Sequence, residues 1–138
     1  MIYITRKEHF NAAHKLFNPA WSEEQNNATF GKCANKNWHG HNYDLFVTVK
    51  GNINPDTGFV VNLKELGDLI RTDVTDILDH KNLNIDVEGM NIMPSTENVA
   101  IFIWNKLATK IAVMGATLHG IKLYETESNY VEYFGETH

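Results

Sequence analysis

The sequence has only one cysteine, Cys33, among its 138 residues. A lone cysteine cannot form a disulfide within the chain, so stability does not rest on an oxidising compartment and we expect a cytoplasmic protein. Long hydrophobic runs are also missing. The longest purely apolar run covers residues 99–104, whereas a membrane-spanning helix needs roughly 20 such residues. We therefore expect no membrane association.

Basic residues are outnumbered, with 12 Lys and Arg against 17 Asp and Glu, and the net charge is −5. They form no cluster along the chain. Binding to nucleic-acid phosphates needs clustered cations, so we expect no nucleic-acid partner. Histidine, in contrast, occurs seven times, which is roughly double its average usage and makes metal chemistry the first function to test.

The length and the 43% of apolar residues predict one globular domain over residues 1–138. Alternating and helical periodicities predict strand, strand, helix, helix, strand, strand, at residues 2–13, 42–50, 62–78, 94–114, 121–126 and 130–134. Residues 18–32 lack sustained periodicity and are expected to form a loop. The fold class is therefore α+β, with a four-stranded antiparallel sheet and two helices on one face. The open sheet edges predict oligomerisation by sheet extension.

Both expected helices begin with capping signals. Asn62, followed three residues later by Glu65, resembles a capping box. In "PSTEN", Ser95 or Thr96 is a candidate N-cap for the second helix. Glu97 then lies in the first turn, where negative charge is favoured by the helix dipole.

The segment "GKCANKNWHGHNY", residues 31–43, concentrates side chains that bind metals. His39 and His41 are two residues apart, so on a strand they point to the same face. His14, at the end of "HFNAAH", is a third candidate from the preceding strand, whereas His9 has the opposite parity and is a poor partner. Three histidines leave a fourth zinc position open, as in catalytic sites. The alternative is three ordinary polar strand residues.

Cys33 allows three interpretations. It is a buried apolar filler, a fourth metal ligand, or a working thiol. Its polar flanks "GK" and "ANKN" argue against the filler. A thiol near zinc loses its proton more easily and becomes a base or nucleophile, whereas a fourth ligand would close the site. The sequence leaves these two open.

Two further acidic positions each have a structural and a functional interpretation. Asp79 and His80 end the first helix, where a histidine is favoured by the dipole, or where the pair serves proton transfer. Glu125 shares strand parity with Ile121 and Leu123. A carboxylate on such an apolar face needs donors, either from a ligand with adjacent N–H groups or from a lysine or arginine. Alternatively, residue 125 lies beyond the core in water.

Five segments, "FNAAH", "GKCANKNWHGHNY", "LDHKNLN", "STENVA" and "YETESN", together resemble the 6-pyruvoyltetrahydropterin synthases, in the same order along nearly the whole chain. This resemblance implies a tunnelling fold, in which trimers form a barrel and two trimers stack into a homohexamer. It also implies active sites between subunits, and a lyase that converts 7,8-dihydroneopterin triphosphate to 6-pyruvoyltetrahydropterin for tetrahydrobiopterin biosynthesis.

The resemblance further implies a role for each candidate residue. The metal ligands for Zn²⁺ would be His14, His39 and His41, the catalytic residues Cys33, Asp79 and His80, and the substrate-binding residues Glu125, Thr96 and Glu97. Cys33 would remove a proton from the substrate side chain, and Glu125 would anchor the pterin ring.

Two alternatives accompany this prediction. The related 6-carboxytetrahydropterin synthases of queuosine biosynthesis use the same substrate and share the histidines, the Asp-His pair and the late glutamate. They typically have fewer residues between the cysteine and the HGH segment than the five, 34–38, found here. The lesser alternative is a non-catalytic zinc- or pterin-binding protein, which would have no use for a proton relay.

Overall fold

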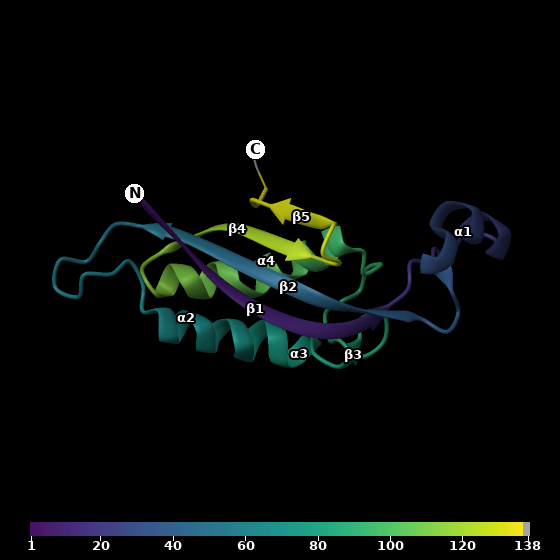
Figure 1. Ribbon diagram of the computed structural model, residues 1–138, viewed down its shortest axis with the longest axis horizontal. Coiled ribbons are helices and arrows are strands. Elements are labelled where there is room, and N and C mark those ends of the chain that lie inside the picture. The colour runs from purple at the N-terminus through teal and green to yellow at the C-terminus, as the bar shows by residue number, and fades with distance from the viewer. Residues whose placement is uncertain (137–138) are drawn as a thin grey trace.

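The computed structural model describes residues 1–136 and contains a five-stranded sheet with the strand order β3-β1-β2-β4-β5. The strands are β1 (Ile2–His14), β2 (His39–Gly51), β3 (Lys81–Asn82), β4 (Thr117–Tyr124) and β5 (Tyr130–Tyr133). The helical segments are α1 (Glu23–Phe30), η1 (Gly31–Ala34), α2 (Leu63–Ile70), η2 (Arg71–Thr75), α3 (Asp76–Leu78) and α4 (Thr96–Val113). Helices α2, α3 and α4 lie on one side of the sheet, and α1 lies beyond its end (Figure 1).

The long strands β1 and β2 form the frame of the sheet. They pair antiparallel over their full lengths, from Ile2 opposite Gly51 to His14 opposite His39. Alternate side chains of β2 are fully buried against the helices, among them Tyr43, Leu45 and Val47. This alternation is the period of two expected of a strand with one covered face. The frame therefore carries the predicted histidines of both strands to one end of the sheet.

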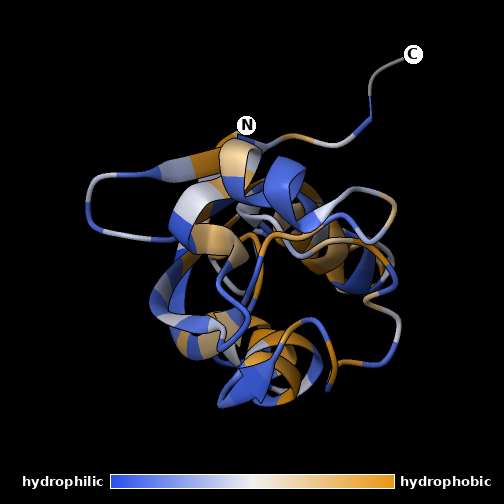
Figure 2. Cartoon of the chain, turned by 90° about the vertical axis from the view of Figure 1, so that its right-hand side faces the viewer, coloured by the Kyte–Doolittle hydropathy of each residue, from blue (hydrophilic) through white to orange (hydrophobic). Residues whose placement is uncertain are grey.

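The helices cover the sheet through amphipathic faces, and their ribbons alternate between hydrophobic and hydrophilic residues (Figure 2). The predicted caps are confirmed. The Asn62 side chain accepts hydrogen bonds from the backbone N–H groups of Lys64 and Glu65, and the Ser95 side chain accepts one from Asn98. The predicted helix from residue 62 to 78 is continuous but contains a π-helical segment, η2, between α2 and α3.

The structure corrects the prediction at two places. Residues 18–32 are not simply a loop, because α1 begins after Ser22, whose side chain caps the backbone N–H of Gln25. The sheet has a fifth strand, β3, in which two residues pair parallel to Ala12 and Ala13. A two-residue strand has no periodicity to detect, and α1 lacks an apolar stripe, so neither element produced a periodic pattern in the sequence.

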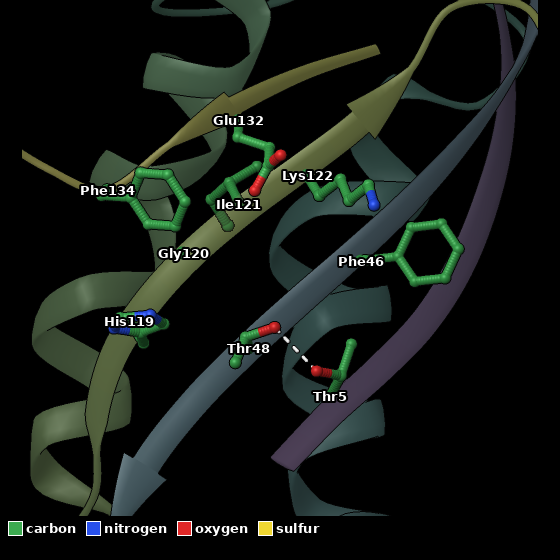
Figure 3. Close-up of a pocket in the computed structure, with 9 residues that line it drawn as sticks. All are labelled: Thr5, Phe46, Thr48, His119, Gly120, Ile121, Lys122, Glu132 and Phe134. Atoms are coloured by element: carbon green, nitrogen blue, oxygen red, sulfur yellow. Dashed lines mark hydrogen bonds between the residues drawn. The ribbon is translucent and has the colours of Figure 1, made fainter. Parts of the chain in front are cut away.

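No helix of residues 1–136 lies on the opposite face of the sheet (Figure 1). A cavity of about 320 Å³ on this face is lined by side chains of β1, β2 and β4 and of the β5 region (Figure 3). The hydroxyl groups of Thr5 and Thr48 form a 2.7 Å hydrogen bond there. None of the predicted site residues lines this cavity. Among the helices of residues 1–136, we find none with the length and apolar character needed to span a membrane.

Candidate metal and active site

Three histidines meet where β1 ends and β2 begins. His14 lies directly opposite His39, and His41 lies opposite Ala12, so all three side chains share the helix-covered face of the sheet. The ring centroids are 4.6 Å apart for His14 and His39, 4.9 Å for His39 and His41, and 5.1 Å for His14 and His41. The structure thus brings together the three side chains that the sequence selected as candidate ligands. His9 stays apart, opposite Asp44 on the other face.

The backbone fixes which nitrogen of His14 faces its neighbours. His14 is 1% exposed, and its Nδ1 lies 2.7 Å from the carbonyl oxygen of Pro94. A carbonyl only accepts hydrogen bonds, so Nδ1 carries the proton and donates it. In the neutral ring, Nε2 then keeps its lone pair for a metal ion.

Glu125 is the fourth member of the cluster. Its Oε1 atom lies 3.3 Å from His14 Nε2 and 2.9 Å from His41 Nε2, and its Oε2 accepts a hydrogen bond of 2.8 Å from the Thr96 hydroxyl. Contact with His14 holds the pKa of the Glu125 carboxyl at about 2, with Thr96 and His41 acting in the same direction against the effect of burial. Glu125 is therefore an anion that points inward, rather than a solvent-exposed residue beyond the core.

The imidazoles of β2 are held in the neutral form that metal ions bind. Burial lowers the pKa of His39, and the neighbouring His14 and His41 lower it further. Burial also lowers the pKa of His41, although Glu125 opposes this shift. Neutral imidazole is the ligand form of histidine, so the cluster needs little proton release to coordinate a cation.

The donor set fits a divalent metal ion. One ligand atom from each of His14, His39, His41 and Glu125 can be chosen so that all four lie within 4.8 Å of one another. Among the described residues, the buried Nε2 of His39 has no hydrogen-bond partner, and those of His14 and His41 have only Glu125 Oε1 within reach. Such buried nitrogens are costly unless another group satisfies them, and a zinc ion bound by imidazole does so.

Cys33 lies beside these histidines. It belongs to the short helix η1 and is a free, partly exposed thiol. A cavity of about 560 Å³ is lined by Lys32, Cys33, Asn35, His39, Gly40 and His41. Cys33 is absent from the group of side chains that could hold a metal ion. This geometry favours the working thiol over the fourth ligand.

Asp79 and His80 lie at a different place, on the outer edge of β1. Asp79 Oδ1 accepts a 2.8 Å hydrogen bond from the backbone N–H of Asn11, and Oδ2 lies 2.8 Å from His80 Nδ1. The bond from Asn11 is the main cause that lowers the pKa of Asp79, and the bond from His80 adds to it. The His80 side chain is 83% exposed and its residue has a φ of 60°. The pair is formed, but neither residue lines the cavity of Cys33.

The remaining predicted residues line a smaller cavity. Thr96, Glu97 and Glu125 line a volume of about 110 Å³ together with Asn129, Tyr130 and Val131. The sequence analysis missed Tyr43, whose buried hydroxyl has no partner among the described residues and whose ring centroid lies 5.7 Å from that of His41. Its position two residues after His41 was the signal that could have identified it.

Comparison with known proteins agrees with this fold and with the family resemblance. The sequence profile of the family described as 6-pyruvoyl tetrahydropterin synthase matches residues 3–136. A 6-pyruvoyl tetrahydrobiopterin synthase of Pongo abelii is 44% identical over 134 residues, which cover 96% of this chain and 91% of the relative. The chain therefore belongs to the 6-pyruvoyl tetrahydropterin synthase family and is an enzyme of the lyase class. The family resemblance seen in the sequence is confirmed.

A solved structure and a more distant relative complete the comparison. The structure of Caenorhabditis elegans 6-pyruvoyl tetrahydropterin synthase superimposes with a TM-score of 0.89 at 37% identity, covering 98% of this chain and 96% of that one. A 6-carboxy-5,6,7,8-tetrahydropterin synthase of Rickettsia conorii is 27% identical over 149 aligned positions, covering 96% of this chain and 99% of the relative. The α+β fold class is confirmed by the first of these matches.

Proposed function

We propose that this chain converts 7,8-dihydroneopterin triphosphate to 6-pyruvoyltetrahydropterin and eliminates triphosphate, with Zn²⁺ as its cofactor. The observation that carries this proposal is the convergence of His14, His39 and His41 beside the thiol of Cys33. Relatives at 42–44% identity that are named 6-pyruvoyl tetrahydrobiopterin synthases support the same reaction. A free thiol in the site suits the reducing cytoplasm.

The three histidines would hold the metal ion through the ring nitrogens that cluster within 4.8 Å of one another. A zinc ion there supplies Lewis acidity, which makes C–H bonds next to the substrate's side-chain oxygens more acidic. Pro94 positions His14 through its carbonyl oxygen. This backbone contact is the orienting hydrogen bond that metal-bound histidines usually have.

Cys33 acts as the base. Its thiolate accepts a proton from a side-chain carbon of the substrate, and the shared cavity places it on the same side as His39 and His41. Rearrangement of the double bonds then moves electrons from the side chain to the pterin ring, so the side-chain carbons are oxidised to carbonyls and the ring is reduced to a tetrahydropterin. The carbon–oxygen bond to triphosphate breaks, and its electron pair leaves with the triphosphate. Electrons balance within the substrate, so no external redox cofactor is required.

Glu125 anchors the pterin ring. A carboxylate with a pKa of about 2 stays ionised and accepts two parallel hydrogen bonds from adjacent N–H groups of a ring. Thr96 fixes one of its oxygens through the 2.8 Å hydrogen bond. Glu97 lines the same small cavity and completes the proposed substrate contacts.

Asp79 and His80 protonate the substrate in a neighbouring subunit. The exposure of the His80 ring and its position on the outer edge of β1 support this assignment. The edge of β1 is open from residue 2 to residue 10, because β3 covers only Ala12 and Ala13. Edge strands of this length pair readily with another chain. In a homohexamer built as a dimer of trimers, with each trimer a barrel, strands of neighbouring subunits would pair with these open edges.

The carboxy-type reaction is the second candidate, because a 6-carboxy-5,6,7,8-tetrahydropterin synthase also aligns over nearly the whole chain. The test is incubation of the zinc-loaded protein with dihydroneopterin triphosphate, followed by mass spectrometry of the products. A pyruvoyl side chain supports the proposal. A carboxylate accompanied by acetaldehyde supports the second candidate, and unchanged substrate contradicts both.

A further inference from the structure

The cavity beside Cys33 contains one charged residue. Of its six lining residues, Lys32 is the one lysine or arginine. None of the six is an aspartate or a glutamate. In a chain with a net charge of −5, an acid-free cavity of about 560 Å³ with a lysine at its wall is suited to an anion.

The ammonium group of Lys32 is available for such an anion. The lysine ion pairs among residues 1–136 use Lys7 and Lys110. Lys15 is held elsewhere, with Nζ 4.5 Å from the ring centroid of Trp38 and 5.0 Å from that of Phe17. It lines a separate cavity together with Lys36. Lys32 is thus the lysine that the fold presents next to the thiol.

Two different cavities adjoin the histidine cluster, and their charges differ. Glu97 and Glu125, which contacts His14 and His41, line the small cavity of about 110 Å³. Lys32 and Cys33 line the large one together with His39 and His41. A ligand with a polyanionic end is repelled by the carboxylates and attracted by the ammonium group, so it can enter in only one orientation.

We propose that Lys32 binds the triphosphate group of the substrate and thereby sets the direction in which the substrate crosses the histidine cluster. This inference rests on the proposed function. The ring lies at Glu125, the side-chain oxygens lie at the three histidines, and the triphosphate extends into the cavity of Lys32. An ammonium group next to phosphate oxygens forms charge-assisted hydrogen bonds, which contribute more to binding than neutral ones.

The experiment compares two ligands that differ only in the triphosphate. Every protein carries Cys33→Ala, so that the substrate is bound but not consumed, and is loaded with zinc. Dissociation constants are measured by calorimetry for dihydroneopterin triphosphate and for dihydroneopterin. We expect Lys32→Ala to weaken binding of dihydroneopterin triphosphate about tenfold or more and to leave the dissociation constant of dihydroneopterin unchanged. Lys32→Arg should retain part of the affinity for the triphosphate. Lys36→Ala is the matched control, because Lys36 lines a different cavity.

The outcomes separate this inference from the proposed function. If Lys32→Ala leaves the ratio of the two dissociation constants at its original value, Lys32 does not bind the triphosphate, although the proposed function stands. An equal loss for both ligands would also overturn the assignment, because it indicates damage to the site as a whole. If neither ligand binds to the Cys33→Ala protein, the proposed function fails and this inference fails with it.

Discussion

At the scale of single residues, the site depends on side chains whose neighbours restrict their protonation. His14 donates from Nδ1 to the carbonyl of Pro94, which leaves Nε2 as the nitrogen that faces the cluster. Thr96 donates to Glu125, which keeps the carboxylate from rotating away. One proposed ligand, His14, and the proposed anchor, Glu125, are therefore each oriented by a neighbouring group.

Replacing Cys33 by alanine separates metal binding from turnover. Because Cys33 is not among the clustered ligand atoms, we expect the variant to keep its zinc while turnover falls by about two orders of magnitude or more. Metal analysis and steady-state kinetics on the same preparation measure both. Loss of zinc would identify the thiol as a ligand, and unchanged turnover would remove it from the mechanism.

His80 occupies a backbone conformation that favours glycine, with a φ of 60°. We expect His80→Gly and His80→Ala to lose activity alike, because both lack the imidazole. The glycine variant should be the more stable of the two by about 1 kcal/mol, because only the alanine keeps a side chain in the left-handed region. Urea unfolding of both variants measures the difference. Equal stability would show that the residue is not strained, and full activity of either would exclude the proposed proton transfer.

At the scale of elements, the start of α4 joins the fold to the site. Pro94, the cap Ser95 and the first helical residue Thr96 are consecutive, and two of them contact His14 and Glu125. The capping hydrogen bond from the Asn98 N–H to Ser95 Oγ is 3.2 Å long. A correctly capped start of α4 therefore positions both the candidate ligand His14 and the candidate anchor Glu125.

We expect Ser95→Ala to lower the free energy of unfolding by about 1 kcal/mol, which is the usual effect of losing an N-cap. The matched control is Ser22→Ala, which removes the cap of α1. Helix α1 lies beyond the end of the sheet (Figure 1), so its loss should affect global unfolding less. Urea denaturation of the three proteins tests this. Equal destabilisation by both changes would contradict the special role of the α4 start.

The elements also show what a sequence can and cannot reveal. The period of two in residues 45–49 and the caps at Asn62 and Ser95 identified β2, α2 and α4, because burial of one face leaves a regular pattern. Helix α1 escaped because it has no apolar face, although Ser22 and Gln25 have capping-box spacing. Strand β3 escaped because its pairing with β1 depends on tertiary contacts alone.

The site followed the same division. The spacing of His39 and His41 predicted that their rings would lie together, and the strand end at His14 supplied the third ring. The contact between Pro94 and His14, which are 80 residues apart, has no local signature. The placement of Lys32 and Glu125 in two different cavities beside the cluster has none either, because it depends on how η1 and the end of β4 are placed in space.

At the scale of the whole molecule, the open edge of β1 makes a prediction about assembly. The backbone N–H and C=O of Asn11 point away from β2 and form hydrogen bonds with Asp79 and His80. Backbone direction alternates along a strand, so the N–H and C=O of Lys7, four residues earlier, also point away from β2. We expect Lys7→Pro to remove an outward N–H, leave the pairing of β1 with β2 intact, and shift the proposed hexamer to smaller species. Analytical ultracentrifugation measures this, with Lys7→Ala as the control. A hexamer in both variants would show that this edge does not join subunits.

The account depends most directly on the metal. Protein purified without chelators is to be assayed for zinc by inductively coupled plasma mass spectrometry, beside a variant with His14, His39 and His41 replaced by alanine and a control with His9→Ala. We predict about one zinc ion per chain in the unmodified protein and the control, and none in the triple variant. Absence of zinc from the unmodified protein, or zinc retained by the triple variant, would contradict the account.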